Sequence, residues 1–282
     1  MGRFSKLETE GKKGQEPADV QDDGPLGLPK VKTRPKLATG GGTPAESADY
    51  DQGHYLSEGD KYYYDGEYQK ALRYFSRAMQ VDQSSVEAWI GQVKCLVVLK
   101  QYKEASIWVL RGLELFPEDP RLVSLQGLTY ALNGTIKRAI GCSDYAMSRP
   151  TPATAFIWAV RGHILSLADN QNAAFCFDKA MEVRDKEDWR TPLEIGLLLL
   201  HERKWSRAVS FLQIAAQANQ KNRFLWKKLG YANERLGLGQ AAHEAYTAAL
   251  HLNAGDREAE HALRNLTTTS LPIRLWRRLT GR

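Results

Sequence analysis

The chain has 282 residues, 43% of them hydrophobic, and a formal net charge of +6. This apolar content suffices for a substantial core, and no apolar run reaches the roughly 18 residues of a membrane-spanning helix. Residues 267–282 hold four arginines and no acid, whereas residues 51–266 hold 27 basic and 25 acidic side chains. The net charge is therefore weak evidence that the main body binds nucleic acid.

Residues 1–50 are rich in Gly, Pro and charged side chains and poor in aliphatic ones. Pairs such as Gly24-Pro25 and Thr43-Pro44 interrupt any helix. Such a segment buries too little apolar surface to offset the entropy lost on ordering, so we predict a disordered leader. Its first residues lack the apolar stretch of a signal peptide, which favours a cytoplasmic protein.

The next 200 residues contain a cassette of small and apolar residues, Ala-x3-Phe-x2-Ala in its first copy, that returns at steps of 34, 34, 34, 35 and 34 residues. A regular period in this range predicts a solenoid of stacked units. The leading and closing residues of the six copies are Ala71/Ala78, Ala105/Gly112, Ala139/Ala146, Ala173/Ala180, Ala208/Ala215 and Ala242/Ala249.

A second signature precedes each cassette by 11 or 12 residues. It is a glycine in five of the six units and Val93 in the other; the glycines are Gly59, Gly127, Gly162, Gly196 and Gly230. A small residue at a helix crossing lets two backbones approach closely, and a bulky residue one turn away fills the gap beside it. Each unit therefore predicts two antiparallel helices. The short interval from Gly162 to Ala173 predicts a tighter or shifted turn in the fourth unit.

These units resemble the tetratricopeptide repeat, which has a 34-residue period and the pattern Trp-x2-Leu-Gly-x2-Tyr, Ala-x3-Phe, Pro. Trp89, Trp158 and Trp226 stand at the Trp position, and Phe116-Pro117 matches the end of a repeat. The resemblance implies an all-α fold, a right-handed α-solenoid of six helix-turn-helix repeats within residues 51–256. The repeats start near residues 52, 86, 120, 154, 189 and 223.

Residues 257–266 follow Asp256, a good helix N-cap, and carry one apolar stripe. We expect them to form the capping helix that covers the last repeat of a solenoid. Residues 267–282 then form a basic C-terminal tail.

The resemblance also implies a binding surface on the concave face, lined by the first helix of each repeat. It predicts a groove that holds a peptide segment or an amphipathic helix of a protein partner. The predicted groove residues are Tyr63, Tyr64, Ile90, Lys94, Val97, Leu128, Ala131, His163, Leu197, His201, Lys227, Tyr231 and Arg235. A charge placed at Val97 or Leu128 is expected to abolish partner capture without unfolding the chain. Co-chaperone members of the family hold a C-terminal carboxylate, but of the corresponding positions here only Arg121 suits such a clamp.

The basic tail is a second candidate site. Leu271, Leu275 and Leu279 recur every four residues between arginines. This pattern suits a short helix that docks on a partner or on an anionic membrane surface. The predicted docking residues are Arg274, Leu275, Trp276, Arg277 and Arg278.

No catalytic or metal-binding pattern occurs. The six histidines are scattered, and no HExxH, Walker or G-x-S-x-G motif is present. Cys95, Cys142 and Cys176 lie far apart inside predicted helices, which indicates buried thiols instead of a zinc site or a disulfide framework. We therefore expect no enzyme activity and no cofactor.

The sequence favours a non-enzymatic adaptor or scaffold that binds a partner peptide in its groove. Two alternatives stay open: a secretion or assembly chaperone for an aggregation-prone client, and a scaffold held at a membrane surface by residues 271–282. Nucleic-acid binding is the least favoured use of the surface. The expected location is the cytoplasm, either free or peripheral at a membrane.

Overall fold

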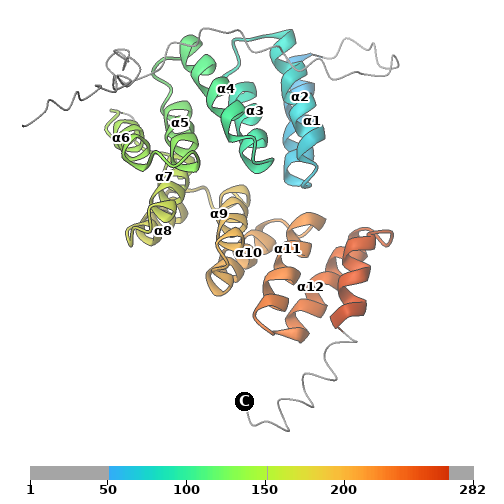
Figure 1. Cartoon of the computed structure of the whole chain (residues 1–282). Helices are drawn as coiled ribbons and strands as arrows, with labels where there is room; N and C mark the ends of the chain where they lie inside the picture. The colour runs from blue at the N-terminus through green and yellow to red at the C-terminus, as the bar shows by residue number, and fades with distance from the viewer. Residues whose placement is uncertain (1–50, 151, 267–282) are drawn as a thin grey trace, which may run out of the picture.

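The computed structural model describes residues 51–150 and 152–266, most of which are helical and none of which form a strand. Helices pair in sequence order along an arc (Figure 1). They are α1 (Gln52–Tyr64), α2 (Tyr68–Val81), α3 (Val86–Val98), α4 (Tyr102–Leu115), α5 (Pro120–Leu132), α6 (Ile136–Met147), α7 (Ala155–Leu167), α8 (Ala173–Val183), α9 (Arg190–His201), α10 (Trp205–Ala218), α11 (Arg223–Arg235) and α12 (Gly239–Leu252). The chain is thus an all-α solenoid of helix-turn-helix repeats. The predicted leader and basic tail, with Arg274, Leu275, Trp276, Arg277 and Arg278, lie outside the described residues.

Each pair is joined by a turn with one residue of left-handed backbone, at φ between 52° and 84°. These residues are Gly66, Lys100, Gly134, Asp169, Arg203 and Gly237. In the first turn the Gly66 N–H donates to the Tyr63 carbonyl and the Glu67 N–H donates to the Tyr62 carbonyl. This pair of hydrogen bonds satisfies the last carbonyls of α1, and the chain reverses there. The same device therefore ends every first helix.

The fourth turn is shifted, as its spacing predicts. Helix α8 begins at Ala173, four residues after the left-handed Asp169, whereas the other second helices begin two residues after theirs. Helix α8 consequently loses its first half-turn and has 11 residues.

Small residues set the distance between the two helices of a pair, as the cassette predicts. The leading alanines of all six units are buried, and five are completely inaccessible. A Cβ added at Gly162 would lie 2.5 Å from Phe177, and one added at Gly230 would lie 2.8 Å from Tyr246. Gly91, which is not one of the periodic glycines, approaches Phe75 of the preceding unit in the same way. Close backbone approach therefore operates both within and between repeats.

Residues 257–266 form a further helix against α12, packed through Ala259 and Leu263. The Asp256 carboxylate accepts hydrogen bonds from the Glu258 and Ala259 N–H groups, both at 3.1 Å. It also pairs with Lys227 of α11 at 3.1 Å. The end of the solenoid is thereby covered and tied to the last repeat.

A substitution pair tests this packing. We expect Gly162→Ala to lower the free energy of unfolding by about 1–3 kcal/mol, because the new methyl group meets the Phe177 ring. Gly141 is exposed on α6, with open space around its Cβ position, so Gly141→Ala should instead raise the free energy of unfolding by roughly 0.5–1 kcal/mol. Urea denaturation measures both. Equal effects of the two substitutions would contradict the packing role of Gly162.

Candidate functional site

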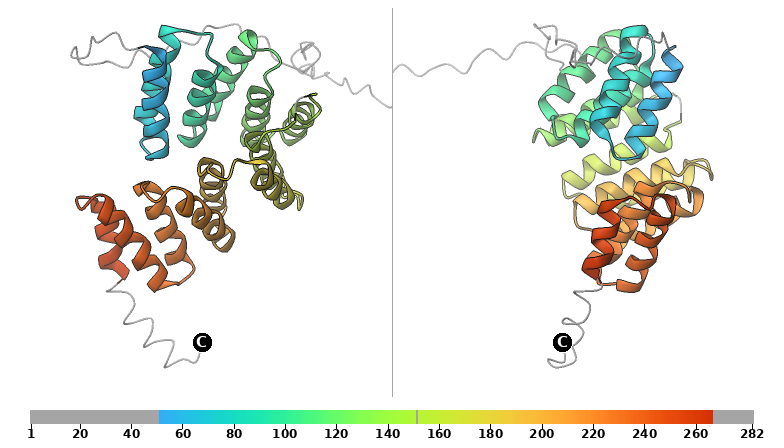
Figure 2. Two further views of the ribbon diagram at one scale, coloured as in Figure 1. Left: turned by 180° about the vertical axis from the view of Figure 1, so that it is seen from behind. Right: turned by 90° about the vertical axis from the view of Figure 1, so that its right-hand side faces the viewer.

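The solenoid curves until its first repeat meets its fifth and sixth. The arc is visible from both sides in Figures 1 and 2, with α1 and α2 facing α11. The Tyr64 ring contacts Trp189 edge-on at 5.1 Å between centroids, and Tyr68 contacts Phe224 at 6.4 Å. Tyr63 and Tyr64 belong to the same buried cluster as Leu199 of α9. We call this contact the ring closure.

Polar groups reinforce the ring closure. The Tyr64 hydroxyl donates to Glu194 Oε1 at 2.8 Å, and Lys94 Nζ forms an ion pair with the same oxygen at 2.6 Å. Asn222 Nδ2 donates to the Tyr64 carbonyl at 3.0 Å. Although burial opposes the charge of Lys94, the Glu194 carboxylate holds its pKa above the ordinary value. Three repeats therefore meet at one charge-assisted network.

The turn after α1 is shaped for this contact. Gly66 has φ of +81°, and an added Cβ there would overlap the Phe224 ring of α11. Glycine is thus required twice, for its left-handed backbone and for the close approach.

Closure converts the concave face into a cavity of about 460 Å³ that remains partly open to solvent. Its wall comes mainly from the first helices of the repeats. The lining residues are Tyr63, Tyr68, Lys94, Val97, Val98, Lys100, Tyr102, Leu125, Leu128, Leu132, Phe156, Ala159, Val160, His163, Glu194, Ile195, Leu197, Leu198, Leu200, His201, Lys228 and Tyr231. Most of this wall is aliphatic or aromatic. Such a mainly apolar concavity with a few polar groups is typical of a ligand site.

Eight of the predicted groove residues lie in this wall. They are Tyr63, Lys94, Val97, Leu128, His163, Leu197, His201 and Tyr231. Their role in binding stays a prediction, but the structure brings side chains from the first helices of all six repeats to one cavity.

The other predicted groove residues lie elsewhere. Tyr64 is part of the ring closure, and Ile90 and Ala131 pack into the core around α3 and α5. Lys227 forms ion pairs with Asp256 and Glu258, at 3.1 and 2.6 Å. None of these four side chains lines the cavity.

Arg235 is the fifth of these residues, and it lies over the Trp205 ring at 5.4 Å, outside the cavity wall. The polar and turn residues that the sequence prediction missed are Glu194, Lys228, Tyr68, Lys100 and Tyr102, and it also missed apolar wall residues such as Val160 and Ile195. No local sequence pattern distinguishes these positions from their neighbours.

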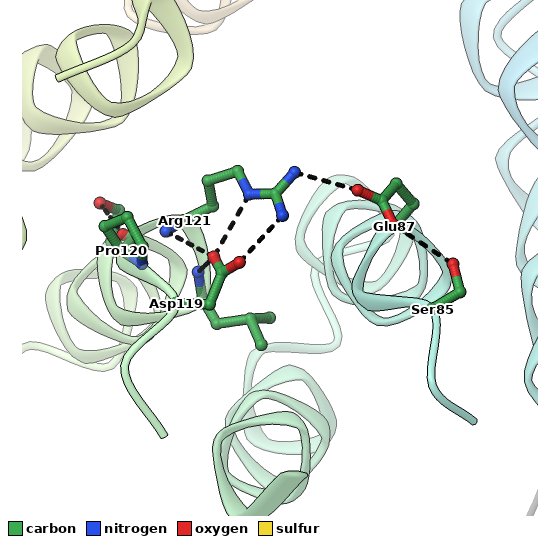
Figure 3. A network of polar contacts seen from close by, with 7 residues as sticks. Ser85, Glu87, Asp119, Pro120 and Arg121 are labelled. Atoms are coloured by element: carbon green, nitrogen blue, oxygen red, sulfur yellow. Dashed lines mark hydrogen bonds and ion pairs between the residues drawn. The ribbon is translucent and has the colours of Figure 1, made fainter. Parts of the chain in front are cut away.

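Arg121, the one residue compatible with a carboxylate clamp, already has acidic partners. Figure 3 shows its guanidinium between Asp119, which pairs with it at 2.9 Å, and Glu87 of α3, at 3.2 Å. Asp119 also caps α5 by accepting from the Arg121 and Leu122 N–H groups. Arg121 therefore ties two repeats together.

Within residues 51–150 and 152–266, no group of three or more His, Cys, Asp or Glu side chains is placed to hold a metal ion. The three cysteines are buried free thiols, as the sequence predicts. No helix in the described part of the chain is long and apolar enough to cross a bilayer.

Residues 62–128, from the end of α1 to α5, match the family model of the tetratricopeptide repeat. The same helix-pair design, with its left-handed turn and small-residue crossings, continues to α12. No curated protein is significantly similar to the sequence.

Several solved structures are similar in fold. The APC/C hetero-tetramer Cut9–Hcn1 is 15% identical, with a TM-score of 0.46; the match covers 77% of this chain and 43% of that chain. A tetratricopeptide repeat protein from Parabacteroides merdae ATCC 43184 is 13% identical, with a TM-score of 0.47 and coverage of 78% and 86%. YrrB, described as having an unusual peptide-binding site, is 16% identical, with a TM-score of 0.40 and coverage of 67% and 97%.

The ring closure predicts a response to loss of Glu194. We expect Glu194→Gln to destabilise the chain by about 1–3 kcal/mol, because the half-buried Lys94 ammonium loses its anion. The radius of gyration from small-angle X-ray scattering should rise as the ends separate. The double variant Lys94→Met/Glu194→Leu removes both charges and should recover most of the stability. A Glu194→Gln variant with wild-type scattering and stability would show that this network does not hold the closure.

His163 predicts a pH dependence. Burial lowers its pKa to about 4, so between pH 6.5 and 4 the unfolded chain binds a proton that the folded chain does not. Stability should therefore fall as the pH falls through this window, with a slope of up to about 1.4 kcal/mol per pH unit. Urea denaturation at pH 7 and pH 5 should show a smaller loss for His163→Gln than for wild type. An equal loss in both proteins would assign the pH dependence to other groups.

Proposed function

We propose that this chain, which carries tetratricopeptide repeats, is a non-enzymatic adaptor that binds a peptide segment of a protein partner in its central cavity. Tetratricopeptide repeats are commonly scaffolds for protein–protein interaction. The observation that carries the proposal is the mainly apolar cavity of about 460 Å³ on the concave face, walled by the first helices and closed by the contact between the two ends.

The cavity suits a short segment better than a long one. Pockets of about 300–1,000 Å³ hold ligands the size of a few side chains. A helix with its side chains is about 10–12 Å across, and a helix that ran the length of the solenoid would need an open trough instead. Of the two occupants that the sequence left open, an extended segment that inserts a few apolar side chains therefore fits better than an amphipathic helix.

The rim of the cavity provides the contact surface. Val98 and Tyr231 are 39% and 42% exposed, on α3 and α11. Val97, Leu197 and Leu198 are half-buried beside them in the wall. Apolar side chains that remain accessible in a concavity gain free energy when a partner covers them, at about 25 cal/mol per Å² of apolar surface.

A matched pair of valines tests the proposal. We expect Val97→Glu to lower the recovery of bound partners at least about tenfold in affinity purification with quantitative mass spectrometry, because a carboxylate in the apolar wall must be desolvated on binding. Val81→Glu, at a position 53% exposed at the end of α2, should recover the wild-type set. Recovery of the full set by Val97→Glu, with a wild-type circular dichroism spectrum, would exclude the cavity as the binding site.

Leu128 is not a suitable second position, contrary to the sequence-based expectation. It is 5% exposed and packs in the core around α3 to α7. A charge there would unfold the repeat as well as alter the cavity.

A further inference from the structure

Basic residues outnumber acidic residues in the cavity wall. Lys94, Lys100 and Lys228 line it, and Glu194 is the one acidic residue among the described side chains that do so. With His163 neutral at pH 7, because burial lowers its pKa, the wall carries an excess of positive charge. Low-dielectric walls of one sign attract and orient ligands of the opposite sign.

The charges of two of these lysines are already compensated, one by a carboxylate and one by water. Lys94 is neutralised by Glu194 at 2.6 Å and is surrounded by the Tyr63 and Tyr64 rings, at 4.6 and 5.3 Å from its ammonium. Lys100 is the exposed left-handed residue between α3 and α4, where water solvates its charge.

Lys228 differs from both. It is half-buried on α11, with its ammonium 4.9 Å from the Phe224 ring centroid. No carboxylate of the described residues forms an ion pair with it. The nearby Glu258 pairs instead with Lys227 at 2.6 Å, and burial lowers the pKa of Lys228. A desolvated ammonium without an anion is unfavourable, so a carboxylate delivered by a ligand would be bound strongly there.

We propose that the cavity selects an extended apolar peptide segment that carries an acidic side chain, whose carboxylate pairs with Lys228. This proposal rests on the proposed function and adds the chemistry of the partner. Alternate side chains of an extended segment point to opposite sides. Residues on one side can therefore enter the wall near Val97 of α3 and Leu197 of α9, while an acidic side chain on the other side reaches Lys228 of α11.

The test uses a set of defined peptides and the full chain. Fluorescein-labelled nonapeptides carry Leu, Val or Phe at alternate positions, proline at both ends and a central Asp or Glu; each has a twin with Asn or Gln instead. Fluorescence anisotropy measures binding to wild type, to Lys228→Met and to the control Lys137→Met. Lys137 is exposed on α6 outside the cavity wall, and its substitution changes the net charge equally.

For wild type and Lys137→Met we expect the acidic peptides to bind at least about tenfold tighter than their amide twins, the usual strength of a charge-assisted hydrogen bond. Lys228→Met should abolish this difference and leave the amide twins unaffected. It should also keep or raise the melting temperature, because the ammonium has no anion in the unliganded chain. A purely structural Lys228 would lower the melting temperature instead.

Other outcomes overturn the proposal in distinct ways. Equal binding of acidic and amide twins would reject the acidic preference and leave peptide binding intact. Dodecanoate, an apolar chain with one carboxylate, serves as the probe that is not a peptide. No binding by any peptide, or Lys228-dependent binding of dodecanoate alone, would reject the peptide occupant and the proposed function with it. A synthetic peptide of residues 18–28 of this chain contains three aspartates. If it bound most tightly, the ligand of the cavity would be the chain's own leader instead of a partner protein.

Discussion

The close approach of helices at small residues is the constraint on which the rest of this structure depends. In the first, fourth, fifth and sixth repeats, a buried glycine lets the second helix bring Phe, Leu or Tyr against the backbone of the first, and buried alanines lead the second helix in all six repeats. Because interiors are close-packed, this contact fixes the angle and distance of each helix pair within narrow limits. Repeated along the chain, the same small rotation accumulates into an arc. The arc is tight enough for the first repeat to reach the fifth and sixth, and the cavity exists because of it.

The periodic part of the structure could be predicted from the sequence, and the closed part could not. A 34-residue period, the cassette alanines and the glycines before them specify where helices lie and how pairs pack. The left-handed backbone at Lys100, Asp169 and Arg203 has no sequence signal, because these residues are not glycines and their conformation follows from the chain reversal.

The ring closure joins residues that share no local pattern. Tyr64 and Glu194 are 130 positions apart, and their contact depends on the summed rotation of the intervening repeats. A one-residue step on a helix turns the side chain by about 100°, so Lys228 faces the cavity and its neighbour Lys227 does not. Small errors in rotation per repeat redirect side chains on α11, so the sequence predicted the wall of the cavity near its centre better than at its ends.

The ring closure also changes how this solenoid should behave as a polymer. In an open array each repeat contacts its neighbours alone, and terminal units fray independently. Here the Tyr64 carbonyl accepts a hydrogen bond from Asn222, 158 positions away. Contacts of such long sequence separation raise the contact order and form late, after most of the chain is in place. The end repeats are thereby coupled in one cooperative unit, and the energetic distinction between terminal and internal repeats is reduced.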